Sequence, residues 1–120
     1  MSAHWPKSPA DLVDRFTAAV TGIDGLEQRQ MFGYPAAFIG GHLTTSLHRA
    51  DWAVRLGAAV AEERRAAGWA AFAPMPDRPM REYVTLPPEV AQDPDVARGW
   101  VEQAADYVRT LPPKAQRQPR

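Results

Sequence analysis

The fold is decided by residues 36–48, which read AAFIGGHLTTSLH. Two adjacent glycines tolerate the positive φ that both central positions of a type I′ turn require, so Gly40 and Gly41 predict a tight β-hairpin. Its strands are residues 36–39 and 42–48. Because side chains alternate between the two faces of a strand, the second strand is expected to place Leu43, Thr45 and Leu47 on one face and His42, Thr44, Ser46 and His48 on the other.

Alternation typical of antiparallel strands extends on both sides of this hairpin, from Leu26 to Leu56. A turn at residues 49–51 leads into a further strand, 52–56, that directs Trp52, Val54 and Leu56 to the core. Later in the chain, residues 69–72 are expected as an edge strand and residues 81–86 as another strand. The prolines between them predict an irregular loop.

Two segments with apolar stripes at three- and four-residue spacing predict amphipathic helices, and a segment between them, rich in alanine, glutamate and arginine, predicts a short, partly exposed helix. The first runs from Ser8, expected to cap it ahead of Pro9, to about Thr21. The second covers residues 58–67 and ends at Gly68, and the third starts at Asp93-Pro94 and ends before Pro112. The predicted fold class is α+β, an antiparallel β-sheet of about five strands with three helices packed against it, in the order α-β-β-β(-β)-α-β(-β)-α.

Length and composition point to one ordinary globular domain. The 120 residues are 45% hydrophobic and 23% charged, close to the globular average, and no apolar run reaches the roughly 18 residues of a membrane span. The absence of cysteine excludes a disulfide scaffold, a thiolate metal site and a cysteine nucleophile. We expect a cytoplasmic protein with a flexible N-terminus over residues 1–7, a single domain over 8–111 and a basic, disordered tail over 112–120.

Charge argues against nucleic acid as the main partner. Fourteen basic residues balance fourteen acidic ones, but Lys114, Arg117 and Arg120 lie in the tail, so the body carries a net negative charge. A nucleic-acid-binding domain usually gathers its cations on one face, and no such stripe is visible in the body. Contact with a phosphate backbone is therefore expected only weakly, through the tail.

No pattern in the sequence predicts catalysis, a metal or a cofactor. His42 and His48 share a predicted strand face, but six residues of strand separate them by about 20 Å, too far to share one ion. Ser46 lies near His48 without an orienting carboxylate or an oxyanion loop, so polar side chains on a surface strand explain the pair better. The chain also lacks a glycine-rich phosphate-binding motif. We therefore expect no metal site, no cofactor and no catalytic residue.

Six residues are candidates for a ligand or a partner. A guanidinium offers a fork for a carboxylate or a phosphate, so Arg55 and Arg81 suggest a cleft for a small acid. Trp69, just before the proline-rich loop, is expected to be partly exposed and to mark an interface. The residues expected around the cleft are Tyr34, His48, Arg55, Arg81 and Tyr83.

The order of elements and several residues resemble the N-terminal domain of the TfoX/Sxy family of small bacterial proteins. The resemblance covers about residues 8–114. It is carried by Met31-Phe32-Gly33-Tyr34-Pro35 with the Gly-Gly hairpin, by Val54-Arg55-Leu56, by Gly68 with Phe72 and Pro74, by Met80-Arg81-Glu82-Tyr83-Val84-Thr85-Leu86-Pro87, and by Trp100 and Leu111-Pro112-Pro113-Lys114. Residues 42–48 depart from the family in being more polar.

The resemblance implies an α+β fold, no established reaction or cofactor, and regulation of natural competence through protein partners. It also implies a second, helical C-terminal domain, which a chain ending at Arg120 is expected to lack. The leading hypothesis is thus a non-catalytic interaction or regulatory domain that forms a homodimer. Its alternatives are a small-ligand-binding or hydrolytic domain with a cleft near Arg55 and Arg81, and nucleic-acid binding through the tail.

Overall fold

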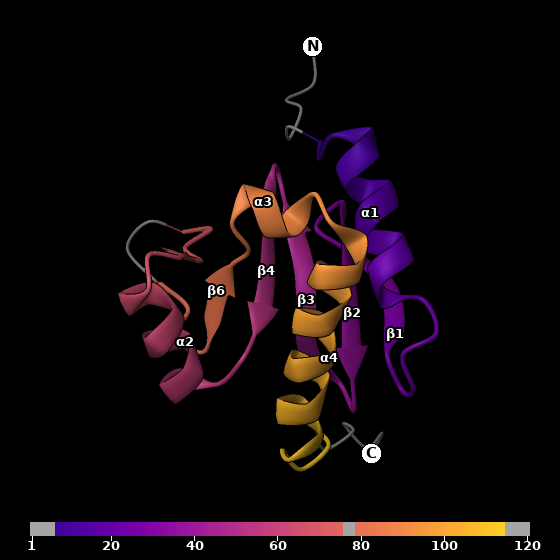
Figure 1. The fold of residues 1–120 in the computed structure, drawn as a ribbon. Helices are drawn as coiled ribbons and strands as arrows, with labels where there is room; N and C mark the ends of the chain where they lie inside the picture. The colour runs from indigo at the N-terminus through magenta and orange to yellow at the C-terminus, as the bar shows by residue number, and fades with distance from the viewer. Residues whose placement is uncertain (1–6, 76–78, 115–120) are drawn as a thin grey trace.

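The computed structural model describes residues 7–75 and 79–114, and these form one six-stranded antiparallel sheet with helices packed against it (Figure 1). The strand order is β1-β2-β3-β4-β6-β5. This confirms the predicted α+β class. The elements in chain order are α1 (Ala10–Val20), β1 (Glu27–Met31), β2 (Tyr34–Ile39), β3 (His42–His48), β4 (Asp51–Arg55), α2 (Ala58–Ala66), β5 (Ala70–Ala71), β6 (Tyr83–Thr85), α3 (Pro88–Ala91) and α4 (Pro94–Arg109).

The main core lies between one face of the sheet and the helices. In Figure 1, α4 crosses in front of β2 and β3 with α1 beside it, and α2 lies next to β6. Trp52 of β4 is fully buried there, 5.4 Å from the ring of Phe16. Its indole Nε1 donates to Thr45 Oγ1 (2.9 Å), and that hydroxyl donates to the Ala53 carbonyl (2.7 Å), so the core threonine is fully engaged.

The helix signals succeed at two places and fail at one. Asp93 caps α4, since its carboxylate accepts from the backbone N–H groups of Asp95 and Val96, and Gly68 ends α2 at φ +106°. Ser8, in contrast, does not cap α1. Pro9 occupies the N-cap position, so Ser8 stands one residue too early, and its buried Oγ has no hydrogen-bond partner among the described residues.

The hairpin prediction is confirmed, and a second tight turn accompanies it. Gly40 and Gly41 have φ of +56° and +82°, as a type I′ turn requires. The turn between β1 and β2 uses Phe32 and Gly33, with φ of +55° and +83°. Phe32 is 87% exposed at this turn.

Strand β3 differs from simple alternation. A bulge opposite Ala37 and Phe38 shifts the register, and Leu43 packs with Phe72 and Tyr83 instead of on the face of Leu47. Part of the second sheet face is also buried, because Phe72 and Met80 pack there with Ala53 and Tyr83. Ser46 is therefore only 2% exposed, where we expected a polar surface strand.

The end of the domain is attached to the β2–β3 turn. The backbone N–H of Lys114 donates to the Gly40 carbonyl (2.9 Å), and the Pro112 carbonyl lies 2.7 Å from His42 Nε2. The predicted flexible N-terminus and most of the predicted tail, residues 1–6 and 115–120, fall outside the described residues. Within the described ranges, each helix is too short or too polar to cross a membrane.

Candidate functional site

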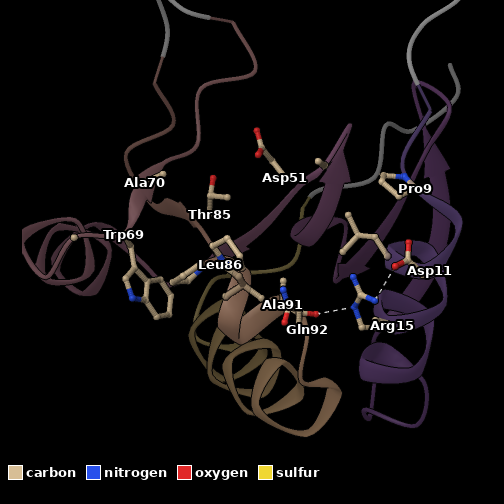
Figure 2. Close-up of a pocket in the computed structure, with 15 residues that line it drawn as sticks. Pro9, Asp11, Arg15, Asp51, Trp69, Ala70, Thr85, Leu86, Ala91 and Gln92 are labelled. Atoms are coloured by element: carbon tan, nitrogen blue, oxygen red, sulfur yellow. Dashed lines mark hydrogen bonds and ion pairs between the residues drawn. The ribbon is translucent and has the colours of Figure 1, made fainter.

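A groove opens between the first turn of α1, α3 and the start of β5, with a volume of about 630 Å³ (Figure 2). Its apolar surface includes the buried Leu12 and Leu86 and the half-buried Trp69. Charged side chains at its rim come from Asp11 and Arg15 on one side and from Asp51 of β4 on another. The other lining residues are mostly proline, glycine and alanine: Pro9, Ala50, Gly68, Ala70, Pro87, Pro88 and Ala91, with Thr85 and Gln92.

Trp69 is held in place from two directions. Gly68 at φ +106° ends α2 and returns the chain to the sheet, which places Trp69 directly before β5. Its ring meets Trp100 of α4 edge-on, with centroids 4.8 Å apart. The guanidinium of Arg64 lies 5.5 Å from the Trp69 ring and 5.6 Å from the Trp100 ring. One side of the indole is thereby fixed, and the indole also lines the groove.

Arg15 joins the two helical walls of the groove. Its Nε donates to the Ala91 carbonyl in α3 (3.0 Å), and its Nη1 donates to Asp11 Oδ2 in α1 (3.2 Å), as Figure 2 shows. The hydrogen bond from Arg15 and its positive charge lower the pKa of Asp11 below the ordinary value. The rim of the groove therefore carries an ion pair between Asp11 and Arg15.

The groove is suited to binding more than to chemistry. Its volume falls in the range of about 300–1,000 Å³ that is usual for ligand sites. The Thr85 hydroxyl, which a reaction could use, already donates to the Ala71 carbonyl (3.3 Å). Among the described residues, no group of three or more His, Asp or Glu side chains could hold a metal ion.

Four of the five residues expected around a cleft lie together, but on the opposite face of the sheet from the helices. The ring of Tyr34 is 5.2 Å from that of His48, which is 6.4 Å from Phe72, which in turn is 6.2 Å from Tyr83. Arg55 continues the row, 5.6 Å from the Tyr83 ring. Phe72 lies between His48 and Tyr83 in this row. Its neighbours in the sequence are alanines and a proline, and they did not indicate that Phe72 would join the row.

Arg55 is engaged by an internal carboxylate. Its Nε donates to Glu82 Oε1 (2.7 Å), and the Tyr107 hydroxyl donates to Glu82 Oε2 (3.0 Å). Burial alone would raise the pKa of Glu82, but the hydrogen bonds from Arg55 and Tyr107 and the charge of Arg55 outweigh it and lower that pKa. Burial and the bond to Glu82 raise the pKa of Tyr107. The three side chains tie β4, the start of β6 and α4 together.

The remaining predicted residues stand apart from this row. Arg81 is exposed in the turn before β6, where its backbone carbonyl accepts from Arg65 Nη1 (3.3 Å). No hydrogen bond or ion pair of the Arg81 side chain is present in residues 7–75 and 79–114. Trp69 lies in the groove on the helical side. Neither the groove nor the smaller cavity beside α1 and β1 is lined by Arg55 or Arg81.

Sequence reasoning missed the groove, because four distant segments assemble it. The element that was not predicted is α3, a four-residue helix that begins at Pro88, directly after Pro87, which was predicted to end the strand. Proline at the first helical position is a recognised start signal, so Pro87-Pro88 could have been interpreted as a stop followed by a start. The role of Glu82 in binding Arg55 and Tyr107 had a weaker signal in the sequence, namely a charged residue within a predicted strand.

No curated protein and no solved structure matches the sequence significantly. The profile of the family described as TfoX N-terminal domain matches residues 18–107, which is three quarters of the chain and runs from α1 into α4. The chain therefore belongs to the TfoX N-terminal domain family.

Proposed function

We propose that this domain is a non-catalytic interaction module of a regulatory system and that its groove binds an apolar segment of a partner protein. Membership of the TfoX N-terminal domain family supports a regulatory, competence-related role at the level of the family. The partner segment presents an apolar side chain to Leu12, Leu86 and Trp69, with polar groups toward the rim.

Trp69 is the observation that carries this proposal. Tryptophan is enriched among the residues that dominate binding energy at protein interfaces, especially where one side of the ring is already fixed. Trp69 has that setting, since Trp100 and Arg64 hold one side and the groove borders another. Because the indole is already ordered, a partner that covers it loses little additional side-chain entropy.

The polar groups on the other sheet face favour a binding role over a catalytic one. Arg55 is bonded to Glu82, and the Tyr83 hydroxyl donates to the Leu43 carbonyl (3.2 Å). Burial raises the pKa of Tyr83 above its ordinary value. These groups are engaged in holding the sheet together, and a general acid, base or nucleophile would have to leave such contacts.

The proposal is tested by selecting peptides from a random display library on the immobilised protein and measuring their affinity by calorimetry. We expect the selected peptides to share an apolar anchor and to lose at least about tenfold in affinity for Trp69→Ala. A second variant, Asp51→Lys, alters the exposed rim without touching the core and should change affinity for charged peptides. Phe32→Ala is the matched control, an exposed aromatic outside the groove. Equal affinity for wild type, Trp69→Ala and Asp51→Lys would contradict the proposal.

Small-ligand binding is the second candidate function, and the convergence of Tyr34, His48, Tyr83 and Arg55 favours it. Native mass spectrometry of gently purified protein distinguishes the two functions. A reproducible added mass that disappears in Arg55→Lys and persists in Trp69→Ala would support the ligand site. The interaction module predicts no such mass.

A further inference from the structure

Among the described residues, strand β1 pairs with β2 alone and forms an open edge of the sheet. Four of its five residues are exposed. A two-residue turn is flanked by a hydrogen-bonded pair, here Met31 and Tyr34, and bonded pairs then recur at every second residue. Glu27 and Arg29 therefore direct their backbone groups to β2, and Gln28 and Gln30 direct theirs outward. The outward groups are ready to pair with another strand.

The charges on β1 favour one register for antiparallel pairing with β1 of a second copy of the chain. Glu27 and Arg29 lie on the same face, 3.0 Å apart, with side chains 69% and 55% exposed. When two β1 strands pair antiparallel with backbone hydrogen bonds between Gln28 and Gln28, each Glu27 lies opposite an Arg29 of the other strand. Shifting the pair by one bonded position sets Arg29 opposite Arg29, or Glu27 opposite Glu27, and like charges directly opposite are destabilising. Of these three registers, only the one with Gln28 opposite Gln28 places Glu27 opposite Arg29.

Phe32 gives a second, independent sign of an interface at the same edge. It is 87% exposed at the end of β1 and holds a left-handed backbone, which costs a non-glycine residue about 1–2 kcal/mol. Asn or Asp suits this turn position far better. In the register just described, the tip with Phe32 comes beside Gly25 of the partner subunit. A Cβ placed at Gly25 would meet no atom of residues 7–75 and 79–114 within 4 Å, so these residues leave room for the ring.

We propose that a second copy of this chain pairs along β1, antiparallel, with Gln28 opposite Gln28, and joins two six-stranded sheets into one. Two glutamates and two arginines then alternate around the two-fold axis, each carboxylate between two guanidiniums. The aromatic ring of Phe32 covers the start of the partner's β1. The interface shares no residue with the groove around Trp69, so both contacts are possible at once.

The test uses two charge reversals of the full chain, followed by sedimentation equilibrium over a range of concentrations. Glu27→Arg sets arginines opposite each other, and Arg29→Glu does the same with glutamates, so each variant alone should self-associate at least about tenfold more weakly than wild type. Mixing the two variants in equal amounts restores unlike pairs, and the mixture should dimerise within about threefold of wild type. Both sites are exposed, so circular dichroism should show unchanged folding.

A wild-type monomer at millimolar concentration, single reversals that dimerise like wild type, or a mixture that stays monomeric would each overturn the proposal. Phe32→Asn adds a second readout, because it relieves the left-handed strain. It should raise the melting temperature while weakening dimerisation, whereas a merely structural Phe32 would leave dimerisation unchanged. Trp69→Ala should leave dimerisation unchanged, which separates this proposal from that of the groove.

Discussion

Replacing Gly57 by alanine should destabilise the domain at the joint between β4 and α2. Gly57 has φ +90° and ψ 156°, a region that only glycine normally occupies, so the backbone strain costs about 1–3 kcal/mol. A Cβ would also lie 2.8 Å from Cε1 of Tyr107, and that ring is anchored by its bond to Glu82. Overpacking adds about 1–3 kcal/mol, and the lower entropy of the unfolded alanine chain returns about 0.4–1 kcal/mol. The net loss is about 3 kcal/mol.

Urea unfolding followed by tryptophan fluorescence measures this loss, with Gly99→Ala as the matched control. Gly99 lies inside α4 without positive φ, and no atom of the described residues lies within 4 Å of a Cβ placed there, so alanine at this position should stabilise by about 0.5–1 kcal/mol. In a Tyr107→Leu background the clash is relieved, and Gly57→Ala should cost less than in wild type. If Gly57→Ala unfolds within about 0.5 kcal/mol of wild type, the described approach of Tyr107 to Gly57 is wrong.

Two further predictions concern the Glu82 network and the helix caps. Glu82 has a pKa below its ordinary 4.5, so its contribution to stability is fully present above that pH and is lost as the pH falls through the lower folded value. The stability difference between wild type and Glu82→Gln, measured by urea unfolding, should therefore shrink on acidification below pH 4.5, and a difference independent of pH would refute the role of the carboxylate. Asp93→Ala should cost about 1 kcal/mol through loss of the α4 cap. Ser8→Ala should cost less than about 0.5 kcal/mol, because the Ser8 hydroxyl has no hydrogen-bond partner in the part of the chain that the structure describes. Equal losses in thermal unfolding would contradict this contrast.

Local signals in the sequence predicted the elements well where one residue decides the geometry. Gly40-Gly41, Gly68 and Asp93 each act through their own backbone or side chain, and the structure confirms all three. Ser8 failed although its local pattern was similar. Hydrogen bonding at a cap depends on register, and Pro9 takes the cap position itself.

The parts that could not be predicted depend on contacts between distant segments. Alternation along β3 indicates two faces but not that Phe72 and Met80 return to cover the polar one. Likewise, Arg55 has the sequence context of a free strand cation, and only the fold brings Glu82 and Tyr107 to it. The groove combines α1, α3, β4 and β5, so Trp69 could be suspected of forming an interface while its surroundings could not be foreseen.

The most direct test of the groove as the contact surface is a ¹⁵N NMR titration of the protein with a peptide selected on it. The tryptophan indole N–H groups report separately on different parts of the fold. If the groove is the contact surface, the Trp69 indole and the amides of Arg15 and Ala91 shift, while the resonance of the Trp52 indole, which is bonded to Thr45 in the core, does not move. Shifts confined to the row from Tyr34 to Tyr83, with Trp69 unmoved, would contradict it.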